Sequence, residues 1–255
     1  MWDAEQYLRF ADQRARPFFD LVDRIDHPAP RLVVDLGCGA GGLTATLLER
    51  WPEAQITGTD SSEEMIGRAL KRAIPGRLEF ERTDIAAWCA AEPLDVIVSN
   101  ACFHWIPDHR RLLENLVAHL APGGVLAFQV PDNFDAPSHT IVREITTGPA
   151  WRDRLGDLPQ AAVESPGWYA ETLMHLGLDA KVWRTTYKHL LEGKNPVLEW
   201  LSGTTLRPVL ARLDGDERDR FINQLGPLLA SAYPQGPGGT LFPFRRIFVV
   251  AHLPG

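Results

Sequence analysis

Four glycines follow an acidic residue in the segment Asp35-Leu36-Gly37-Cys38-Gly39-Ala40-Gly41-Gly42. Glycine lets a backbone turn tightly and approach a ligand without a Cβ in the way. The β-branched run before this segment and the helical spacing after it place the glycines between a strand and a helix, which favours a binding loop over a plain turn. Gly37, Gly39 and Gly42 also satisfy the G-x-G-x-x-G pattern of dinucleotide sites, so the loop alone does not choose its ligand.

Three aspartates lie near the ends of successive predicted strands and narrow that choice. The Asp35 carboxylate, placed under the glycine loop, would attract an ammonium group and repel a pyrophosphate. Asp60 can accept hydrogen bonds from both hydroxyls of a ribose, which either kind of cofactor carries. Asp84 is placed for an adenine amino group, with Ile85 against the ring. Each aspartate alone could be a helix cap, but the three together favour a cofactor site.

The first half of the chain alternates strand and helix patterns with short connections. The pattern predicts strands at 31–36, 55–59, 78–82, 94–99 and 125–130. It predicts helices at 42–51, from a capping box at Ser61 and Glu64 through Leu70, and at 108–120. This alternation indicates an α/β fold with a parallel sheet and helices on both faces, because parallel strands need crossover connections.

The second half is less regular. Residues 133–166 are polar and interrupted by proline and glycine, and a helix should run from Ser165-Pro166 to Gly177. A strand is expected at 181–189, a helical stretch at 195–233 with an acidic start at Asp214, and a last strand at 246–252. We therefore predict one domain over 1–255 with an N-terminal helical segment in 1–30. The insertions 133–165 and 190–242 would cap the carboxyl edge of the sheet, where open α/β sheets bind ligands.

Charge and cysteine content limit the partners. The formal net charge is −7, and a surface of that sign repels phosphate backbones, which argues against nucleic acid. The three cysteines form no C-x-x-C pair, which argues for a reducing compartment and against a zinc site or a disulfide framework. The N-terminus lacks the pattern of a signal peptide, and the apolar runs are too short to cross a bilayer. We expect a cytoplasmic monomer without a metal and without a membrane or nucleic-acid partner.

Four segments resemble the successive cofactor motifs of class I methyltransferases: Val33-Val34-Asp35-Leu36-Gly37-Cys38-Gly39, Thr59-Asp60-Ser61, Thr83-Asp84-Ile85 and Ser99-Asn100-Ala101. The resemblance implies a Rossmann-like, seven-stranded, mostly parallel sheet. It implies S-adenosylmethionine as the cofactor, with S-adenosylhomocysteine as its product. In that family the glycine loop meets the methionine part, the acid after strand two holds the ribose, the acid after strand three lies near adenine, and the end of strand four faces the sulfonium. The implied cofactor-binding residues are Asp35, Gly37, Gly39, Asp60, Ser61, Asp84, Ile85 and Asn100.

Further segments are more particular. They are similar to the family of trans-aconitate 2-methyltransferases over nearly the whole chain: Tyr7-Leu8-Arg9-Phe10, Arg14-Ala15-Arg16-Pro17, residues 100–109, Pro131-Asp132-Asn133 and Trp183-Arg184-Thr185-Thr186-Tyr187. One departure is His104, which stands where the family has a glutamine. The resemblance implies formation of a methyl ester on a carboxylate of a small tricarboxylate.

Such chemistry makes modest demands on the protein. A carboxylate is already a nucleophile at neutral pH, so its attack on a sulfonium methyl needs no general base, and we nominate no catalytic acid or base. The tasks are positioning, charge neutralisation and exclusion of water. Arginine suits a tricarboxylate because its planar fork bonds carboxylates bidentately. The acceptor-binding candidates are Arg14, Arg16, Trp105, His139, Tyr187 and Arg207. Arg245 and His104 are further candidates.

Each candidate has a plainer interpretation. Arg14 and Arg16 lie two residues apart on a helix predicted over Tyr7–Val22, so they point in different directions and only one should reach the ligand. Most arginines are exposed, a lone histidine is more often structural or solvated, and core packing explains the aromatic residues equally well.

Three alternatives remain at the level of the sequence. One is a methyltransferase for another small acid or metabolite. The second is an NAD-dependent oxidoreductase using the same glycines, which is disfavoured because Asp35 and Asp84 have no natural use there. The third is a protein that binds the cofactor without turnover.

Overall fold

The computed structural model describes residues 11–158 and 163–255, with side chains from residue 15 onward. The described chain forms two compact units. The sheet unit comprises residues 15–131, 163–185 and 247–255, and the helical unit comprises residues 132–158 and 186–246 with 11–14. The helical unit overlaps the two predicted insertions in sequence; their role as a cap stays a prediction.

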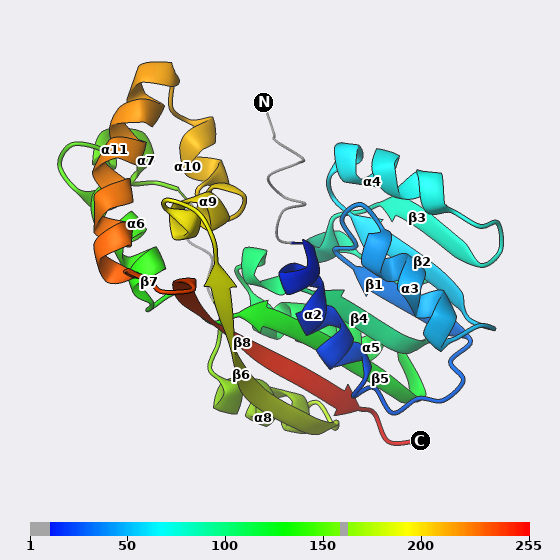
Figure 1. Cartoon of the computed structure of the whole chain (residues 1–255). Helices are drawn as coiled ribbons and strands as arrows, with labels where there is room; N and C mark the ends of the chain where they lie inside the picture. The colour runs from blue at the N-terminus through cyan, green and yellow to red at the C-terminus, as the bar shows by residue number, and fades with distance from the viewer. Residues whose placement is uncertain (1–10, 159–162) are drawn as a thin grey trace. The chain divides into compact units, whose positions relative to one another are not determined.

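The strands form one sheet in the order β3-β2-β1-β4-β5-β8-β6, with β7 paired to β8 (Figure 1). Their bounds are β1 Leu32–Leu36, β2 Gln55–Asp60, β3 Leu78–Arg82, β4 Leu94–Asn100, β5 Leu120–Pro131, β6 Asp179–Leu191, β7 Gln235–Gly236 and β8 Gly239–His252. Strands β1 to β5 pair in parallel throughout. The mostly parallel sheet is therefore confirmed, with the two-residue β7 added to the seven strands expected.

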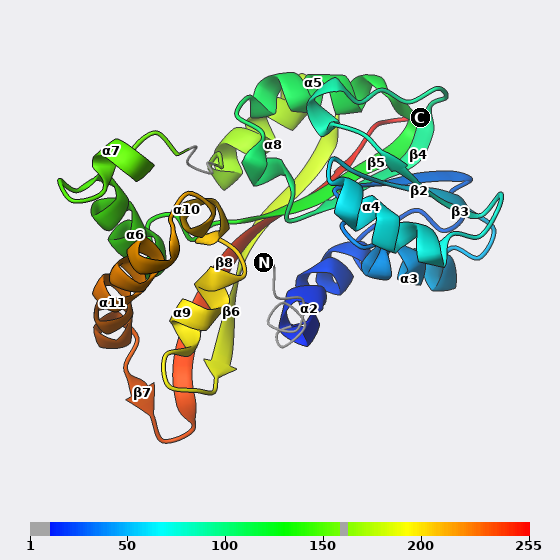
Figure 2. The ribbon, with the colours of Figure 1, turned by 90° about the horizontal axis from the view of Figure 1, so that it is seen from above.

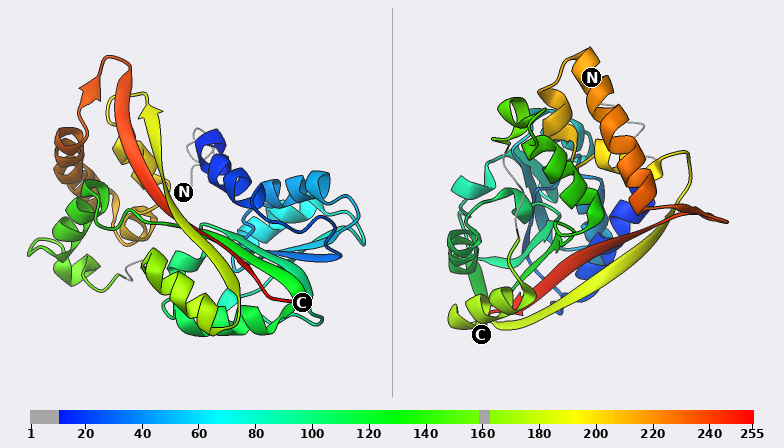
Figure 3. Two further views of the ribbon diagram at one scale, coloured as in Figure 1. Left: turned by 90° about the horizontal axis from the view of Figure 1, so that it is seen from below. Right: turned by 90° about the vertical axis from the view of Figure 1, so that its left-hand side faces the viewer.

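Helices cover both faces of this sheet, as the alternation predicted. The helices of the sheet unit are α3 Gly42–Arg50, α4 Glu63–Ala69, α5 His109–Ala118 and α8 Pro166–His175, with the part of α2 Ala11–Val22 that follows residue 14. Helices α3 and α4 lie on one face and α5 and α8 on the other (Figures 2 and 3). Short 3₁₀ turns occupy Leu70–Arg72, Ile85–Ala87 (η2) and Phe103–Trp105 (η3).

The helical unit has its own apolar core. Its helices are α6 Pro137–Thr147, α7 Arg152–Leu155, α9 Pro196–Ser202, α10 Arg207–Ala211 and α11 Gly215–Ala232. Trp200 and Phe221 are almost fully buried in this core, together with Phe242 from β8. Helix α11 begins at the expected acidic start: Asp214 and Glu217 form a reciprocal capping box.

Strands β6 and β8 continue from one unit into the other. The right-hand view of Figure 3 shows them as long neighbouring ribbons, in agreement with the strand order. Strand β8 places Phe242 in the core of the helical unit and Ile247 in the core of the sheet unit. It also begins earlier than the predicted 246–252 because Gly239 turns back to pair with β7.

Three further details differ from the expectations. The capping box at Ser61 and Glu64 was wrong: Ser62 caps α4, since its Oγ accepts from the Met65 N–H at 3.4 Å. Strand β5 begins at Leu120, which pairs with Leu94 ahead of a register shift, so Gly123 and Gly124 lie inside the strand.

The third difference concerns length: the helical stretch 195–233 is three helices, interrupted after Ser202 and after Ala211. No helix within the described part of the chain is long and apolar enough to span a membrane.

Candidate functional site

The strand order reverses between β1 and β4, which places a topological switch point at the carboxyl ends of these strands. Asp35 of β1 lies beside Val98 of β4 and Gly58 of β2 in parallel register. Open α/β sheets bind ligands in the crevice at such a point. The candidate site is therefore built from the residues that follow β1, β2 and β4, all within the sheet unit.

The glycine loop follows β1 and folds over the end of β2. Gly37 and Cys38 donate their N–H groups to the Thr59 carbonyl at 2.8 and 2.9 Å. Gly37, Gly39 and Gly41 have φ angles of 81°, 56° and 73°, which strain any residue with a side chain. A Cβ on Gly37 would lie 2.5 Å from the Cys102 Sγ, whereas a Cβ on Gly39 would meet no heavy atom within 4 Å. Gly37 is thus needed for packing, and Gly39 faces open space where a ligand could approach the backbone.

Asp60 joins this loop to the end of β2. Its Oδ2 accepts from the Gly39 N–H at 3.0 Å, and its Oδ1 accepts from the Ser62 N–H at 2.9 Å. A carboxylate has about four lone-pair sites, so roughly two remain for a ligand. The carboxylate therefore holds the loop and keeps acceptors free, which fits the role expected at a ribose.

Asp35 is buried under the loop, with 2% of its surface exposed. Its Oδ2 accepts from the Thr44 hydroxyl at 2.6 Å, while its Oδ1 has no partner among the described residues. Burial raises the pKa of Asp35 to about 6, a rise that the Thr44 hydrogen bond opposes and the nearby Asp60 charge adds to. A buried carboxylate with one free oxygen suits a cationic ligand group.

Asp84 and Ile85 lie after β3 as expected, and both also have structural roles. The Asp84 side chain caps η2 by accepting from the Ala86 N–H at 3.0 Å. Ile85 is 6% exposed and packs in the core of the sheet unit, so only a small apolar surface is left for a ring. Ser61 is exposed after β2, and its carbonyl accepts from Arg82 Nε at 3.1 Å.

The end of β4 carries a strained residue. Asn100 accepts a hydrogen bond from Gln129 Nε2 at 2.6 Å, which leaves its amide nitrogen as a donor. Ala101 follows with a φ of 55°, the one positive φ outside glycine in the described ranges 11–158 and 163–255. Residues held in this region cluster at functional sites because the surroundings must offset the strain.

The η3 turn next places His104 and Trp105. Their rings lie 4.6 Å apart between centroids. Trp105 is 54% exposed, so it is not a core residue. This exposure removes the packing interpretation and leaves Trp105 able to contact a ligand.

Two cysteines of the sheet unit border the same region: Cys38 in the glycine loop and Cys102 after β4. Burial raises the pKa of both thiols, to about 12 for Cys102. The thiols therefore stay protonated at neutral pH, and neither is an activated nucleophile.

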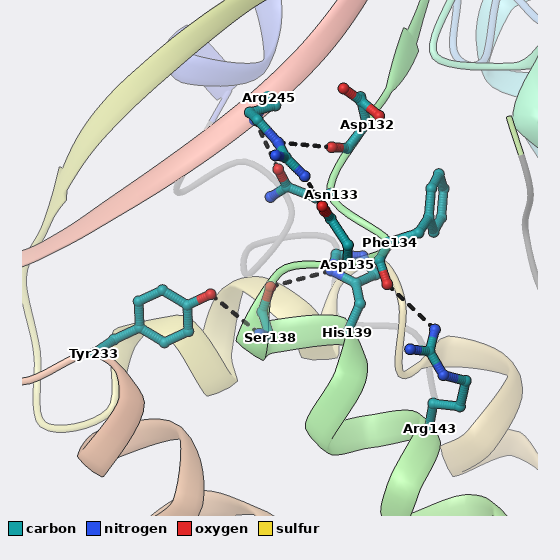
Figure 4. Close-up of polar contacts among 9 residues, drawn as sticks. All are labelled: Asp132, Asn133, Phe134, Asp135, Ser138, His139, Arg143, Tyr233 and Arg245. Carbon is teal, nitrogen blue, oxygen red and sulfur yellow. Dashed lines mark hydrogen bonds and ion pairs between the residues drawn. The ribbon is translucent and has the colours of Figure 1, made fainter. Parts of the chain in front are cut away.

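His139 belongs to the helical unit, in a polar cluster at the start of α6 (Figure 4). Its ring lies between two hydroxyl groups, with Nδ1 3.1 Å from Ser138 Oγ and Nε2 3.2 Å from Thr205 Oγ1. Burial, together with the smaller effect of the Arg143 charge, lowers the pKa of His139 to about 4. His139 is therefore a neutral imidazole whose two nitrogens are already engaged.

Arg245 lies in the same cluster and is fully engaged within it. Its guanidinium forms an ion pair with Asp135, its Nε donates to the Asp132 carbonyl at 3.0 Å, and its backbone N–H donates to Asn133 Oδ1 at 2.7 Å (Figure 4). These contacts fix the turn that leads into α6. They neutralise the Arg245 charge locally, so this arginine serves the fold first.

The other acceptor candidates divide between the units. Arg207 is exposed at the start of α10, two residues after Thr205. Tyr187 is 5% exposed and stacks on His189, with centroids 6.1 Å apart, which indicates core packing. Arg16 is exposed in the sheet unit, and its Nε lies 3.8 Å from Asp20 Oδ2. Arg14 lies on α2, and its side chain falls outside the described residues.

Several residues of the site have no sequence signal. Thr44 on α3 bonds to Asp35, Gln129 on β5 bonds to Asn100, and Thr205 bonds to His139. Thr44 and Gln129 are polar residues within a helix and an apolar strand, and Thr205 lies in a turn between two helices, so only the packed fold reveals their partners. Within the described residues, no group of three or more His, Cys, Asp or Glu side chains could hold a metal ion.

Comparison with known proteins places this geometry in a family. A family model described as a methyltransferase domain matches residues 9–179. The trans-aconitate 2-methyltransferase of Streptomyces avermitilis is 49% identical over 259 residues, spanning 98% of this chain and 96% of that protein. The protein of the same name from Rhodococcus jostii is 49% identical over 257 residues, spanning 99% of this chain and 100% of that protein.

Solved structures agree on the fold. The YcgJ protein of Bacillus subtilis has a TM-score of 0.60 at 14% identity, covering 96% of this chain and 99% of that chain. A Haemonchus contortus phosphoethanolamine N-methyltransferase, solved with phosphomonomethylethanolamine and S-adenosylhomocysteine, has a TM-score of 0.58 at 16% identity, covering 94% and 53%. These similarities confirm the expected Rossmann-like methyltransferase architecture.

The matches leave no support for the oxidoreductase alternative. A methyltransferase domain spans more than half of the chain, and relatives with 49% sequence identity align over almost its full length. The chain therefore belongs to the methyltransferase family, within its group of trans-aconitate 2-methyltransferases.

Proposed function

We propose that this methyltransferase transfers a methyl group from S-adenosylmethionine to a carboxylate of trans-aconitate, giving a methyl ester and S-adenosylhomocysteine. The observation that carries the proposal is the full-length similarity to relatives of that name at 49% identity. The similarity extends over both units, so it includes the residues of the helical unit as well as the glycine loop.

The residues of the switch point fit this cofactor. The buried, unpartnered Oδ1 of Asp35 suits its ammonium group, and the open space at Gly39 lets its methionine part approach the backbone. Asp60, with acceptors to spare, suits the ribose, and Ser61, Asp84 and Ile85 would border the nucleoside. When bound, the cofactor supplies an electrophilic methyl group on a sulfonium.

The chain contributes positioning rather than proton transfer. An acceptor carboxylate is ionised at neutral pH, so no side chain has to remove a proton before methyl transfer. Asn100 has an amide donor at the end of β4. In this proposal exposed Trp105, on the turn that follows, shields the reacting groups from water. Holding the two reacting groups in line accounts for a large part of the rate enhancement in such reactions.

The helical unit would provide contacts for the acid. In this proposal Arg207 binds a carboxylate. Thr205 lies two residues before Arg207, and neutral His139 holds its hydroxyl in place. One of Arg14 and Arg16 would supply further positive charge, and Tyr187 would act as a buried support. A trianion needs such cations because leaving its charge unpaired in a site is costly.

The test is direct. The purified protein is incubated with S-adenosylmethionine carrying a labelled methyl group and with trans-aconitate, cis-aconitate or citrate in parallel. We expect a base-labile labelled ester with trans-aconitate and much less with the other two acids. Label in another acid alone would change the substrate, whereas binding of S-adenosylhomocysteine without any ester would favour a protein that binds without turnover.

We also infer a cytoplasmic monomer. The acidic net charge and the three cysteines without a disulfide support this inference. Light scattering on the purified protein tests the oligomeric state, and a single mass near 28 kDa is the expected result.

A further inference from the structure

His109 and Tyr169 form a buried hydrogen-bonded pair that the proposed reaction does not use. His109 is the first residue of α5 and is 6% exposed, and Tyr169 lies on α8 and is fully buried. His109 Nδ1 lies 2.6 Å from the Tyr169 hydroxyl, and Nε2 lies 2.9 Å from the Phe103 carbonyl. The Tyr169 oxygen also accepts from the Glu164 N–H at 3.3 Å.

The partners indicate the direction of the hydrogen bonds that run through His109. A carbonyl can only accept, so His109 Nε2 carries a hydrogen, and in a neutral imidazole Nδ1 is then an acceptor. The Tyr169 hydroxyl then donates to Nδ1 and accepts from the backbone of Glu164. The hydrogen bonds run one way, from Glu164 through Tyr169 and His109 to Phe103.

A neutral imidazole satisfies these contacts: Nε2 donates to Phe103, and Nδ1 accepts from the Tyr169 hydroxyl. Burial lowers the pKa of His109, which agrees with the geometry.

This series of hydrogen bonds ends at Phe103, on the loop that follows β4. Phe103 begins η3, and its carbonyl accepts both from His109 and from the Ile106 N–H, the latter at 2.8 Å. The η3 turn carries exposed Trp105, and Cys102 just before it fills the space that a side chain on Gly37 would need. The position of Phe103 therefore determines where the Trp105 side chain lies. It also determines the contact between this loop and the glycine loop.

We propose that His109 and Tyr169 are positioning residues that fix the loop 100–105, and through it the alignment of the acceptor for methyl transfer. The claim that the acceptor is aligned rests on the proposed function. The hydrogen bonds themselves rest on geometry within one compact unit.

The activity test uses Tyr169→Phe, which removes one oxygen and keeps the ring that packs against Phe128 at 5.3 Å. We expect kcat for trans-aconitate methylation to fall about threefold to tenfold, the range for one lost hydrogen bond. The Kd of S-adenosylhomocysteine should stay within about twofold, since Asp35, Gly39 and Asp60 are untouched. His109→Gln, whose amide can still donate toward Phe103, should retain more activity than His109→Ala.

The matched control is Leu173→Val, a buried change one turn further along α8 in the same core. It lowers stability without touching the hydrogen bonds, so its kcat should stay near the wild-type value. Equal kcat losses in Tyr169→Phe and Leu173→Val would overturn the proposal, because packing alone would then explain the effect.

Nuclear magnetic resonance decides the same point without any acceptor. The ring nitrogens of His109 should show the neutral Nε2–H form at pH 7, and Tyr169→Phe should shift the backbone amides of residues 101–105 more than Leu173→Val does. A mixture of tautomers, or unmoved loop amides, overturns the proposal. A wild-type protein that leaves trans-aconitate unmethylated would instead count against the proposed function, and the amide shifts would still decide the positioning role.

Discussion

Asp60 holds the glycine loop through the same carboxylate that we assign to the cofactor. Replacing it with alanine removes acceptors from a ligand and also releases the Gly39 N–H. We expect Asp60→Ala to weaken binding of S-adenosylhomocysteine by about 1.5–3 kcal/mol for each lost charge-assisted bond, or at least tenfold in Kd. Titration calorimetry measures this, and Asp60→Asn should lose less because one acceptor oxygen remains. An unchanged Kd would place the ribose elsewhere.

Gly39 and Gly42 give a matched pair for the open side of the loop. A Cβ meets no heavy atom within 4 Å at either position, but only Gly39 has a positive φ, of 56°. Gly39→Ala should cost about 1–2 kcal/mol in stability and should abolish most cofactor binding, because its methyl group would occupy the proposed ligand space. Gly42→Ala, at the start of α3, should leave both nearly unchanged. Denaturant titration and calorimetry separate the two effects, and equal binding by both variants would show that the space at Gly39 is not used.

Asp35 makes stability depend on pH in an unusual direction. Its pKa is about 6 in the folded protein against 3.8 as the ordinary value, so between these limits the folded state binds more protons than the unfolded state. Its contribution to stability is therefore present below pH 3.8 and is lost as pH rises through 6. The loss is on the order of 3 kcal/mol at 1.36 kcal/mol per pKa unit.

Asp35→Asn tests this directly, because an amide oxygen can still accept from Thr44. The variant should be more stable than wild type at pH 7, and the advantage should disappear near pH 4. Urea unfolding at a series of pH values measures the difference. A constant difference across the series would mean that Asp35 has an ordinary pKa.

Helix α11 shows what a single cap contributes at the scale of an element. The Asp214 side chain accepts from the Glu217 N–H at 2.9 Å, and Glu217 also pairs with Arg154 of α7 at 2.6 Å. Asp214→Ala should therefore destabilise the protein by about 0.5–2 kcal/mol. Asp216→Ala, an exposed acid in the same turn, should cost much less, since it caps nothing. Equal effects on the urea midpoint would mean that helix dipole charge, not capping, stabilises α11.

Elements with strong local signals could be predicted from the sequence, whereas helix α6 could not. Its eleven residues begin at Pro137 and end before Gly148, both normal boundary signals. The surrounding proline and glycine residues made the whole segment look irregular, although Ile141, Val142 and Ile145 have helical spacing. The apolar face of α6 is buried mainly against α11, which lies about seventy residues later, so tertiary packing decided its state.

The positions of the proposed cofactor residues in the fold were predictable because parallel strands bring their carboxyl ends to one edge. Asp35, Asp60 and Asn100 lie where the motif spacing placed them, at the ends of β1, β2 and β4. The partners Thr44 and Gln129 were not predictable, since nothing in their local pattern marks them. The one-residue error at Ser61 has a similar cause, because two adjacent serines could each cap α4 and only the backbone geometry selects Ser62.

At the scale of the molecule, the two units should respond to different ligands. The glycine loop, Asp60 and Asn100 belong to the sheet unit, whereas His139 and Arg207 belong to the helical unit. Hydrogen exchange with S-adenosylhomocysteine alone should show protection of the sheet unit at residues 37–41 and 60–62. Adding trans-aconitate should extend protection to peptides that contain His139 and Arg207. Equal protection of both units by S-adenosylhomocysteine alone would remove the basis for assigning the acid to the helical unit.

Strand β8 contributes to both cores, and this has a consequence for synthesis of the protein. Phe242 and Phe244 complete one core, and Ile247 and Val249 complete the other, within a single strand close to the end of the sequence. A chain emerging from the ribosome would hold both cores open until this strand has left the exit tunnel. We therefore expect nascent chains stopped before Gly239 to be captured by chaperones and to be sensitive to protease along their whole length, with neither half folding ahead of the other.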